Sequence, residues 1–253
     1  MLRVLLRNCL LPCAVVALLA LARVHDGRAG EAMPEVDTAL LLAVDVSNSV
    51  DDRRYYLQME GIAKALEDKS VISAITNGPQ GAILFSILAW SDRTEIAVPW
   101  VRISNAEEAR ALAQRIRKLP RITGHFTCVS KALRTIADKV VPQIPAKATR
   151  KVIDVSGDGK EDCNPEEPPE DVRDELVASK VTINGLPILD GSEAATIEEW
   201  YRAHVMGGIG SFVIPADGYG DFERAIRQKF IVEISGAGLP AIRQAAIEAI
   251  PVR

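Results

Sequence analysis

The chain has 253 residues, of which 48% are hydrophobic and 25% are charged, and its formal net charge is −4 at pH 7. This acidic balance argues against nucleic acid as a partner, because binding to a phosphate backbone requires a basic surface. Roughly 230 residues follow the leader described below, which is enough for one α/β domain with a full hydrophobic core.

The first 22 residues have the pattern of a secretory signal peptide. Arg3 and Arg7 precede an apolar segment from about Cys9 to Ala22, whose last three residues, Ala-Leu-Ala, offer a small-x-small cleavage site. This segment is shorter than the ~20 residues that are needed to span a bilayer. We therefore predict an exported protein, periplasmic or secreted, with no membrane span after cleavage. An uncleaved anchor is the alternative.

The first candidate site follows an unbroken apolar run from Leu40 to Val44, which ends at Asp45. Such a run is typical of a strand that is buried on both faces in a parallel sheet. Asp45 then lies at the carboxyl end of the strand, the edge where open α/β sheets bind ligands. Together with Ser47 and Ser49 it places three hard oxygen donors on one turn, which suits Mg²⁺ or Mn²⁺. The same residue types are also common in turns and helix caps.

The next elements in the chain are a helix, two strands and a second helix. The first helix starts after 51–52 and ends before the turn signal Asn77-Gly78-Pro79. A buried strand over 81–90 leads through a hairpin at 91–93 into a strand over 94–98, which Pro99 ends. Ser104 and Glu107 have the spacing of a capping box, which predicts the start of the second helix.

Two later segments add candidate ligands. Thr127 precedes apolar residues in an i, i+3, i+4, i+7 pattern, so its hydroxyl stands at the start of an amphipathic helix, and Thr123 is the alternative ligand in the same loop. The segment K-V-I-D-V-S-G-D-G-K, residues 151–160, is a second buried-strand pattern that ends in Asp158 between two glycines. An acidic, proline-containing loop follows over 161–171.

The remaining pattern predicts alternating helices and strands. These are a helix over 172–179, a strand over 181–189, a helix from the capping box Thr196/Glu199 to Gly207-Gly208, a strand over 211–215, and helices over 219–234 and 239–250. The alternation implies right-handed crossovers and a mostly parallel sheet.

Cys128 and Cys163 lie beside Thr127 and near Asp158 in the sequence. In an oxidising compartment, two cysteines on adjacent loops favour a disulfide. A soft-metal cluster with His125 is the alternative, although the spacing of these three residues is not a recognisable zinc pattern.

In this order, D-x-S-x-S at 45–49, then Thr127, then a strand that ends in Asp158 resemble the von Willebrand factor type A domain over about 36–236. The segments V-D-V-S-N-S-V-D and I-D-V-S-G-D-G are also similar to those of a branch of exported bacterial proteins that has this fold and no assigned function. The resemblance implies an α/β fold that is doubly wound, with a mostly parallel central sheet, helices on both faces and one antiparallel edge strand. Residues 237–253 would form a separate C-terminal helix.

The same resemblance implies a metal-ion-dependent adhesion site. Its hydroxyl ligands would be Ser47, Ser49 and Thr127, and its direct or water-bridged carboxylates would be Asp45 and Asp158. The ion would be Mg²⁺ or Mn²⁺, and its open position would accept a carboxylate from a protein partner.

We therefore expect a non-enzymatic, metal-dependent protein-binding domain. One alternative is a phosphatase-like hydrolase, because Gly157-Asp158-Gly159 with Asp162 also resembles the metal-binding segment of haloacid-dehalogenase-like phosphatases, with Asp45 as the nucleophile. That family has a general acid two residues after the nucleophile, where this chain has Ser47, which cannot supply a proton at a useful pKa. The other alternative is a structural scaffold with a vestigial site.

Overall fold

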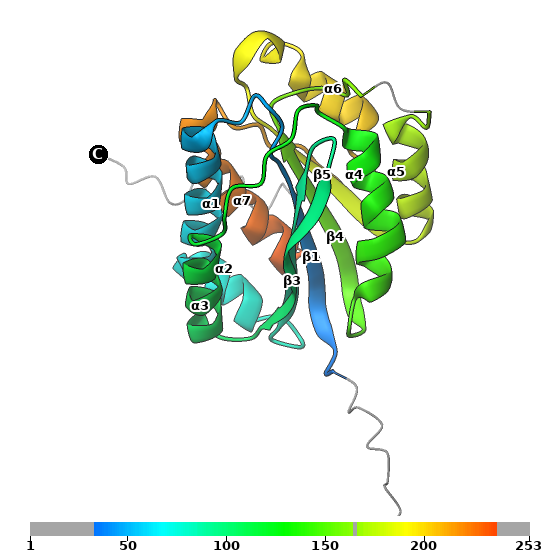
Figure 1. The fold of residues 1–253 in the computed structure, drawn as a ribbon. Coiled ribbons are helices and arrows are strands. Elements are labelled where there is room, and N and C mark those ends of the chain that lie inside the picture. Colours follow the sequence, from blue (N-terminus) through cyan, green and yellow to red (C-terminus); the bar gives the residue numbers. More distant parts are fainter. Residues whose placement is uncertain (1–32, 164–165, 237–253) are drawn as a thin grey trace, which may run out of the picture. The chain divides into compact units, whose positions relative to one another are not determined.

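A computed structural model describes residues 33–163 and 166–236, and in it a five-stranded sheet lies between two layers of helices (Figure 1). The strands are β1 (Val36–Asp45), β2 (Ile83–Trp90), β3 (Thr94–Ile103), β4 (Ala148–Gly157) and β5 (Val181–Pro187). Their order is β3-β2-β1-β4-β5, and every neighbouring pair is parallel except β2 and β3. The predicted fold class, a mostly parallel sheet with one antiparallel edge strand, is confirmed.

The central strand β1 is buried along its whole length. Leu40 pairs in register with Phe85 of β2 and with Val152 of β4. Successive side chains point to opposite faces, so Leu40 and Leu42 pack in one core cluster while Leu41 packs in the other. An unbroken apolar run is therefore needed here, because neither face of the strand meets water.

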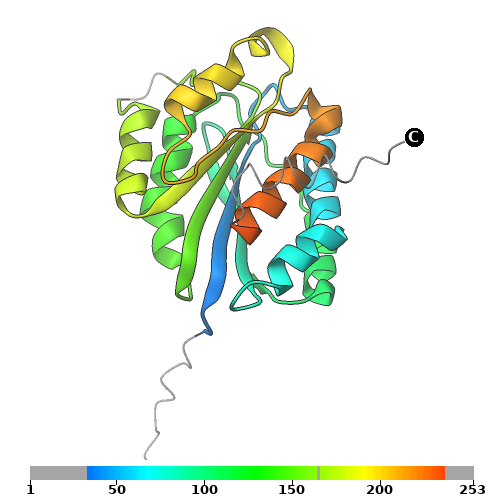
Figure 2. The same ribbon diagram turned by 180° about the vertical axis from the view of Figure 1, so that it is seen from behind.

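Helices cover both faces of the sheet (Figures 1 and 2). One layer contains α1 (Asp52–Glu67), α2 (Lys69–Thr76), α3 (Ala106–Ile116) and α7 (Phe222–Ser235). The other contains α4 (Val129–Thr135), α5 (Pro169–Ala178) and α6 (Ile197–His204). A π-helical turn, Ile136–Val140, and a 3₁₀ turn, Val141–Gln143, extend α4, and two further 3₁₀ turns cover Gly191–Glu193 and Tyr219–Asp221.

Two predicted boundaries in the first half of the chain are wrong. The helix expected to run to residue 76 is broken at Asp68, whose carboxylate accepts hydrogen bonds from the backbone N–H groups of Ser70 and Val71 and so starts α2. Strand β3 continues past Pro99 to Ile103. Proline is tolerated there because β3 is an edge strand with a register shift opposite Ser86.

The expected helix starts also need correction. Asn105, not Ser104, caps α3, because the Asn105 side chain accepts from the N–H groups of residues 107 and 108. Thr196 does precede α6, but its hydroxyl bonds to the backbone oxygen of Glu193 instead of forming a capping box. Helix α6 ends at His204, three residues before the predicted glycines.

The strand expected over 211–215 is absent from the described part of the chain as a regular element. Val213 and Ala216 form only isolated bridges, to Gly185 and Ile188. Strand β5, by contrast, runs unbroken through Gly185 to Pro187.

The predicted leader, residues 1–22, and the predicted C-terminal helix, residues 237–253, lie outside the described residues. None of the described helices combines the length and the apolar character that crossing a membrane requires.

Candidate metal centre

The five candidate ligands come from three segments that meet at one edge of the sheet. Asp45 is the last residue of β1, and Asp158 directly follows the last residue of β4. Because these strands are parallel neighbours, their carboxyl ends lie side by side. The loop before α4 reaches the same edge because the N–H of Gly124 donates to the backbone oxygen of Val46 at 3.1 Å.

Hydrogen bonds connect the candidate side chains into one chain of oxygen atoms. The Ser49 hydroxyl donates to Asp158 Oδ1 at 2.6 Å, and the two hydroxyls of Ser47 and Ser49 lie 3.1 Å apart. The Thr127 hydroxyl donates to Ser47 Oγ at 3.5 Å. Asp45 Oδ1 accepts from the backbone N–H of Ser47 at 2.7 Å. The structure thus brings all five candidates together, whereas the alternative ligand Thr123 is exposed and is not part of this set of hydrogen bonds.

Asp45 is fully buried, and one of its carboxylate oxygens is unsatisfied. Burial and, after it, the negative charge of Asp158 raise the pKa of Asp45 to about 7, while hydrogen bonds from Ser47 act in the opposite direction. Asp45 Oδ2 has no hydrogen-bond partner among the described residues. A buried carboxylate oxygen without a partner costs free energy, so this atom is the one best placed to gain from a cation or a water molecule.

Two glycines let the backbone approach these side chains closely. A Cβ atom on Gly157 would lie 2.8 Å from Asp45 Oδ2 and 2.8 Å from the Tyr201 hydroxyl, and a Cβ on Gly159 would lie 3.0 Å from Thr127 Oγ1. The glycines around Asp158 are therefore required by lack of space at the end of β4, and not by a positive φ.

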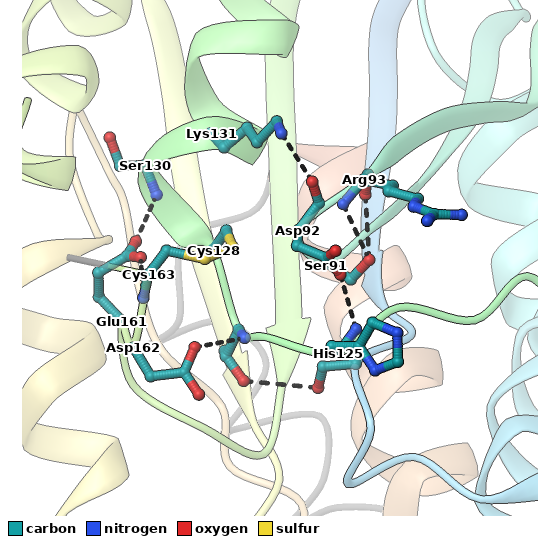
Figure 3. The surroundings of a disulfide bond; sticks show 12 residues. Ser91, Asp92, Arg93, His125, Cys128, Ser130, Lys131, Glu161, Asp162 and Cys163 are labelled. Atoms are coloured by element: carbon teal, nitrogen blue, oxygen red, sulfur yellow. Dashed lines mark hydrogen bonds between the residues drawn. A yellow bond between two sulfur atoms is a disulfide. The ribbon is translucent and has the colours of Figure 1, made fainter. Parts of the chain in front are cut away.

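The acidic loop after β4 is attached to the start of α4 (Figure 3). A disulfide joins Cys128 to Cys163, with the two Cα atoms 5.2 Å apart. Asp162 Oδ1 accepts from the backbone N–H of Thr127 at 2.6 Å, and Glu161 Oε2 accepts from that of Ser130 at 2.7 Å. The expected disulfide is present, and this part of the loop fixes the backbone that carries Thr127.

The alternative soft-metal cluster is not supported by this arrangement. The Glu161 carboxylate lies close to the two cysteine sulfur atoms, but both sulfurs are used in the disulfide. The backbone N–H of His125 donates to Asp92 Oδ1 at 2.6 Å, which anchors the loop, and His125 itself is exposed (Figure 3).

A cationic side chain, Arg54 of α1, lies at the rim of the site. Its Nη1 donates to the backbone oxygen of Ser49 at 2.5 Å and lies 4.0 Å from Asp158 Oδ2. Its Nη2 donates to Asp190 Oδ1 at 3.0 Å. The guanidinium carbon is 5.3 Å from the centre of the Tyr219 ring. Four neighbours therefore fix the orientation of this guanidinium group.

Sequence reasoning did not identify Arg54 or the two tyrosines behind the site. The Tyr201 hydroxyl is buried and has no hydrogen-bond partner among the described residues, and burial together with the charge of Asp45 raises the pKa of Tyr201. Burial and the charge of Asp158 raise the pKa of Tyr219. Of these residues, only Arg54 offered a signal in the sequence, because it lies in the first turn of the helix that follows D-x-S-x-S.

Solved structures with a similar fold include a thread matrix protein, a von Willebrand factor type A protein and a pilus adhesin. Proximal thread matrix protein 1 from the mussel byssus, in a structure described as having a zinc-occupied MIDAS motif, matches with a TM-score of 0.57 and 16% identity over 79% of this chain and 48% of that chain. A von Willebrand factor type A protein from Catenulispora acidiphila matches with a TM-score of 0.54 and 14% identity over 79% of this chain and 43% of that chain.

The third, the pilus adhesin SpaC from Lactobacillus rhamnosus GG, matches with a TM-score of 0.58 and 12% identity over 79% of this chain and 31% of that chain. The chain thus spans less than half the length of each of these proteins. At these identities the likeness establishes the fold, which is that of a von Willebrand factor A domain.

Comparison with curated proteins found no match. The model of one protein family, described as "Protein of unknown function (DUF1194)", matches residues 35–238. This region contains every strand of the sheet and all five candidate ligands. The chain is therefore a member of the DUF1194 family, built on a von Willebrand factor A fold.

Proposed function

We propose that this protein is a metal-dependent binding domain. Its ion, Mg²⁺ or Mn²⁺, is held by the hydroxyls of Ser47, Ser49 and Thr127 and by the carboxylates of Asp45 and Asp158, directly or through water. The observation that carries the proposal is the continuous chain of side-chain oxygens from three separate segments, with the unsatisfied Asp45 Oδ2 behind it.

The donor set fits a small, hard cation. Adjacent ligand oxygens around an octahedral Mg²⁺ lie about 3 Å apart. The spacings between Ser47, Ser49 and Asp158 oxygens are 3.1 Å and 2.6 Å, and that from Thr127 to Ser47 is 3.5 Å. The described site offers oxygen atoms and no thiolate or imidazole, which favours Mg²⁺ or Mn²⁺ over zinc. Such an ion, when bound, supplies a Lewis-acidic position.

A protein partner with a carboxylate group fits this site best. Three of the five proposed ligands are neutral hydroxyls and add no negative charge, so only Asp45 and Asp158 offset the charge of the ion and its open position can still accept an anionic oxygen. Two of the similar structures are described as a thread matrix protein and a pilus adhesin, which supports a binding role over an enzymatic one. The phosphatase alternative fits less well, because Asp162 Oδ1 accepts from the backbone N–H of Thr127 and so holds the loop, and because Ser47 stands where that family has its general acid.

Export of the protein is part of the proposal. Its support is the predicted leader and the disulfide between Cys128 and Cys163, since disulfides persist in oxidising compartments such as the periplasm and the extracellular space.

Calorimetric titration with Mg²⁺ and Mn²⁺ tests the proposed site. We expect saturable binding to the parent protein and loss of that binding in Asp158→Asn. The matched control is Asp52→Asn, because Asp52 is an exposed carboxylate at the same edge of the sheet that pairs with Arg121. Binding that persists in Asp158→Asn, or that is absent from the parent, would contradict the proposal.

A further inference from the structure

Arg54 has a place at the site that metal binding alone does not explain. Among the described residues it is the one basic side chain within 4.0 Å of the Asp158 carboxylate, and none lies that close to Asp45. Its guanidinium group cannot serve as a metal ligand, because all its nitrogens are donors at any accessible pH. A positive charge beside a cation site weakens cation binding, so a purely metal-holding site gains nothing from it.

The contacts of Arg54 show that the charge is fixed there and is not a freely moving surface group. Nη1 is held by the backbone oxygen of Ser49, in the loop that carries two proposed ligands. Nη2 is held on the other side by Asp190, which is 31% exposed. The Tyr219 ring supports the flat face of the group. The side chain of Arg54 is 30% exposed, so the group lies at the opening of the site, within reach of an incoming ligand.

The effect of the positive charge of Arg54 depends on whether an ion is bound at the site. In the absence of an ion, Arg54 partly neutralises Asp158. When a divalent ion is present, the carboxylates of Asp45 and Asp158 balance its charge, and Arg54 adds positive potential at the opening. The guanidinium group of Arg54 has five N–H donors, and its two hydrogen bonds and one ion-pair contact leave some of them unused. The planar group matches the geometry of a carboxylate, which it can bind through two parallel hydrogen bonds.

We propose that Arg54 is a specificity-determining residue that weakens metal binding and strengthens binding of an anionic group. A carboxylate at this site would contact both the ion and the guanidinium group. This inference rests on the proposed function, because it requires an ion at the site. It goes beyond that function by assigning part of the anion recognition to a side chain that is not a metal ligand.

The test measures two affinities in the same variants. Titration with Mn²⁺ gives the metal affinity, and titration of the Mn²⁺-loaded protein with sodium acetate, followed by water-proton relaxation, gives the affinity for a carboxylate. In Arg54→Gln we expect metal binding to become roughly threefold to fivefold tighter and acetate binding to become weaker by a similar factor, the size of one partly exposed ion pair. A merely structural role would instead weaken both.

Arg121→Gln is the matched control. Arg121 donates to the backbone oxygen of Val50, the neighbour of the carbonyl that Arg54 contacts, and it pairs with the exposed Asp52 and not with a proposed ligand. The Arg121→Gln substitution should leave the affinities for Mn²⁺ and for acetate unchanged. Arg54→Lys keeps the charge without the planar fork, so its metal affinity should stay near that of the parent while acetate binds less tightly. Thermal unfolding without metal checks that each variant folds.

The outcomes separate the inference from the proposed function. If the parent binds Mn²⁺ but Arg54→Gln lowers both affinities or changes neither, the role of Arg54 is wrong and the metal site stands. If Arg54→Lys behaves as Arg54→Gln toward the metal, charge is not the cause and the inference is also overturned. If the parent binds no Mn²⁺, both fail together.

Discussion

Lys229 of α7 lies 3.3 Å from Asp154 of β4, and both side chains are completely buried beneath the helix. Glu233, one turn further along α7, is 3.2 Å from the same ammonium group and accepts a hydrogen bond from the Asn184 side chain. The ammonium group also donates to the backbone oxygen of Gly185. This cluster holds one register of α7 against the sheet, because a shift of the helix would leave buried charges without partners.

We expect Lys229→Met to lower the free energy of unfolding by about 3 kcal/mol, because it leaves two buried carboxylates without their cation. Chemical denaturation measures this change. The control is Arg227→Met on the exposed side of the same helix, which should change stability by less than about 0.5 kcal/mol. Equal effects of the two substitutions would show that the buried cluster does not stabilise α7.

The same cluster predicts a pH dependence of stability. Burial, and then the charge of Glu233, raise the pKa of Asp154 well above its usual value, while Lys229 lowers it. Burial likewise raises the pKa of Glu233, against the effects of Lys229, Asn184 and Arg150. In the unfolded chain these carboxyl groups have a pKa of about 4. At pH values above this, the folded state therefore binds more protons than the unfolded state. The contribution of Asp154 to stability must fall as pH rises through this range.

The measurement is the difference in unfolding free energy between the parent and Asp154→Asn, taken from pH 5 to pH 8. The parent should lose stability relative to the variant as pH rises, by at most about 1.4 kcal/mol per pH unit for one proton. A difference that is constant across this range, or that changes in the opposite direction, would contradict the pKa shift of Asp154.

The disulfide should contribute strongly to stability. It closes a loop between residues 35 positions apart, and the chain-entropy model assigns about 4 kcal/mol to a loop of this length. We expect the double substitution Cys128→Ser and Cys163→Ser to lower the unfolding free energy by ~2–4 kcal/mol, and a reducing agent to have the same effect on the parent alone. If the reductant destabilises both proteins equally, the bond is not the cause.

Gly157→Ala should destabilise the end of β4 by about 1–3 kcal/mol, because its new methyl group would meet the buried Asp45 carboxylate and Tyr201 hydroxyl. Gly220→Ala is the control, since a Cβ there has no atom within 4 Å and the residue has no positive φ. Thermal unfolding of both variants without metal tests this. A Gly157→Ala protein as stable as the parent would mean that the site relaxes around the methyl group.

The sequence predicted well those elements whose ends are determined by the residues within a short stretch of the chain. The end of β1 is marked by an apolar run that stops at Asp45, and the end of β4 is marked by the glycines on either side of Asp158; the fold places both ends at one edge of the sheet. The break at Asp68 and the passage of β3 through Pro99 were missed, because each depends on a cap or on an edge position that only the assembled sheet supplies.

The neighbours of the candidate site were harder to predict, because they come from distant segments. Tyr201 and Tyr219 follow the first motif by more than 150 positions in the printed sequence, and neither has a sequence pattern that relates it to Asp45. Lys229 and Glu233 are charged residues of the kind normally expected on an exposed helix face. Their burial follows only from the presence of Asp154 and Asn184 on the strands beneath.

The link between Cys128 and Cys163 also makes the middle of the domain a covalent ring. Helix α4 and strand β4 both lie inside it, and so does the exposed Lys147 between them. A protease that cut the backbone after Lys147 would leave a nicked molecule whose two pieces stay joined beside Thr127 and Asp158. The piece that carries 45–49 and Thr127 would thus stay covalently joined to the piece that carries Asp158, so all three site segments would remain in one molecule after such a cleavage.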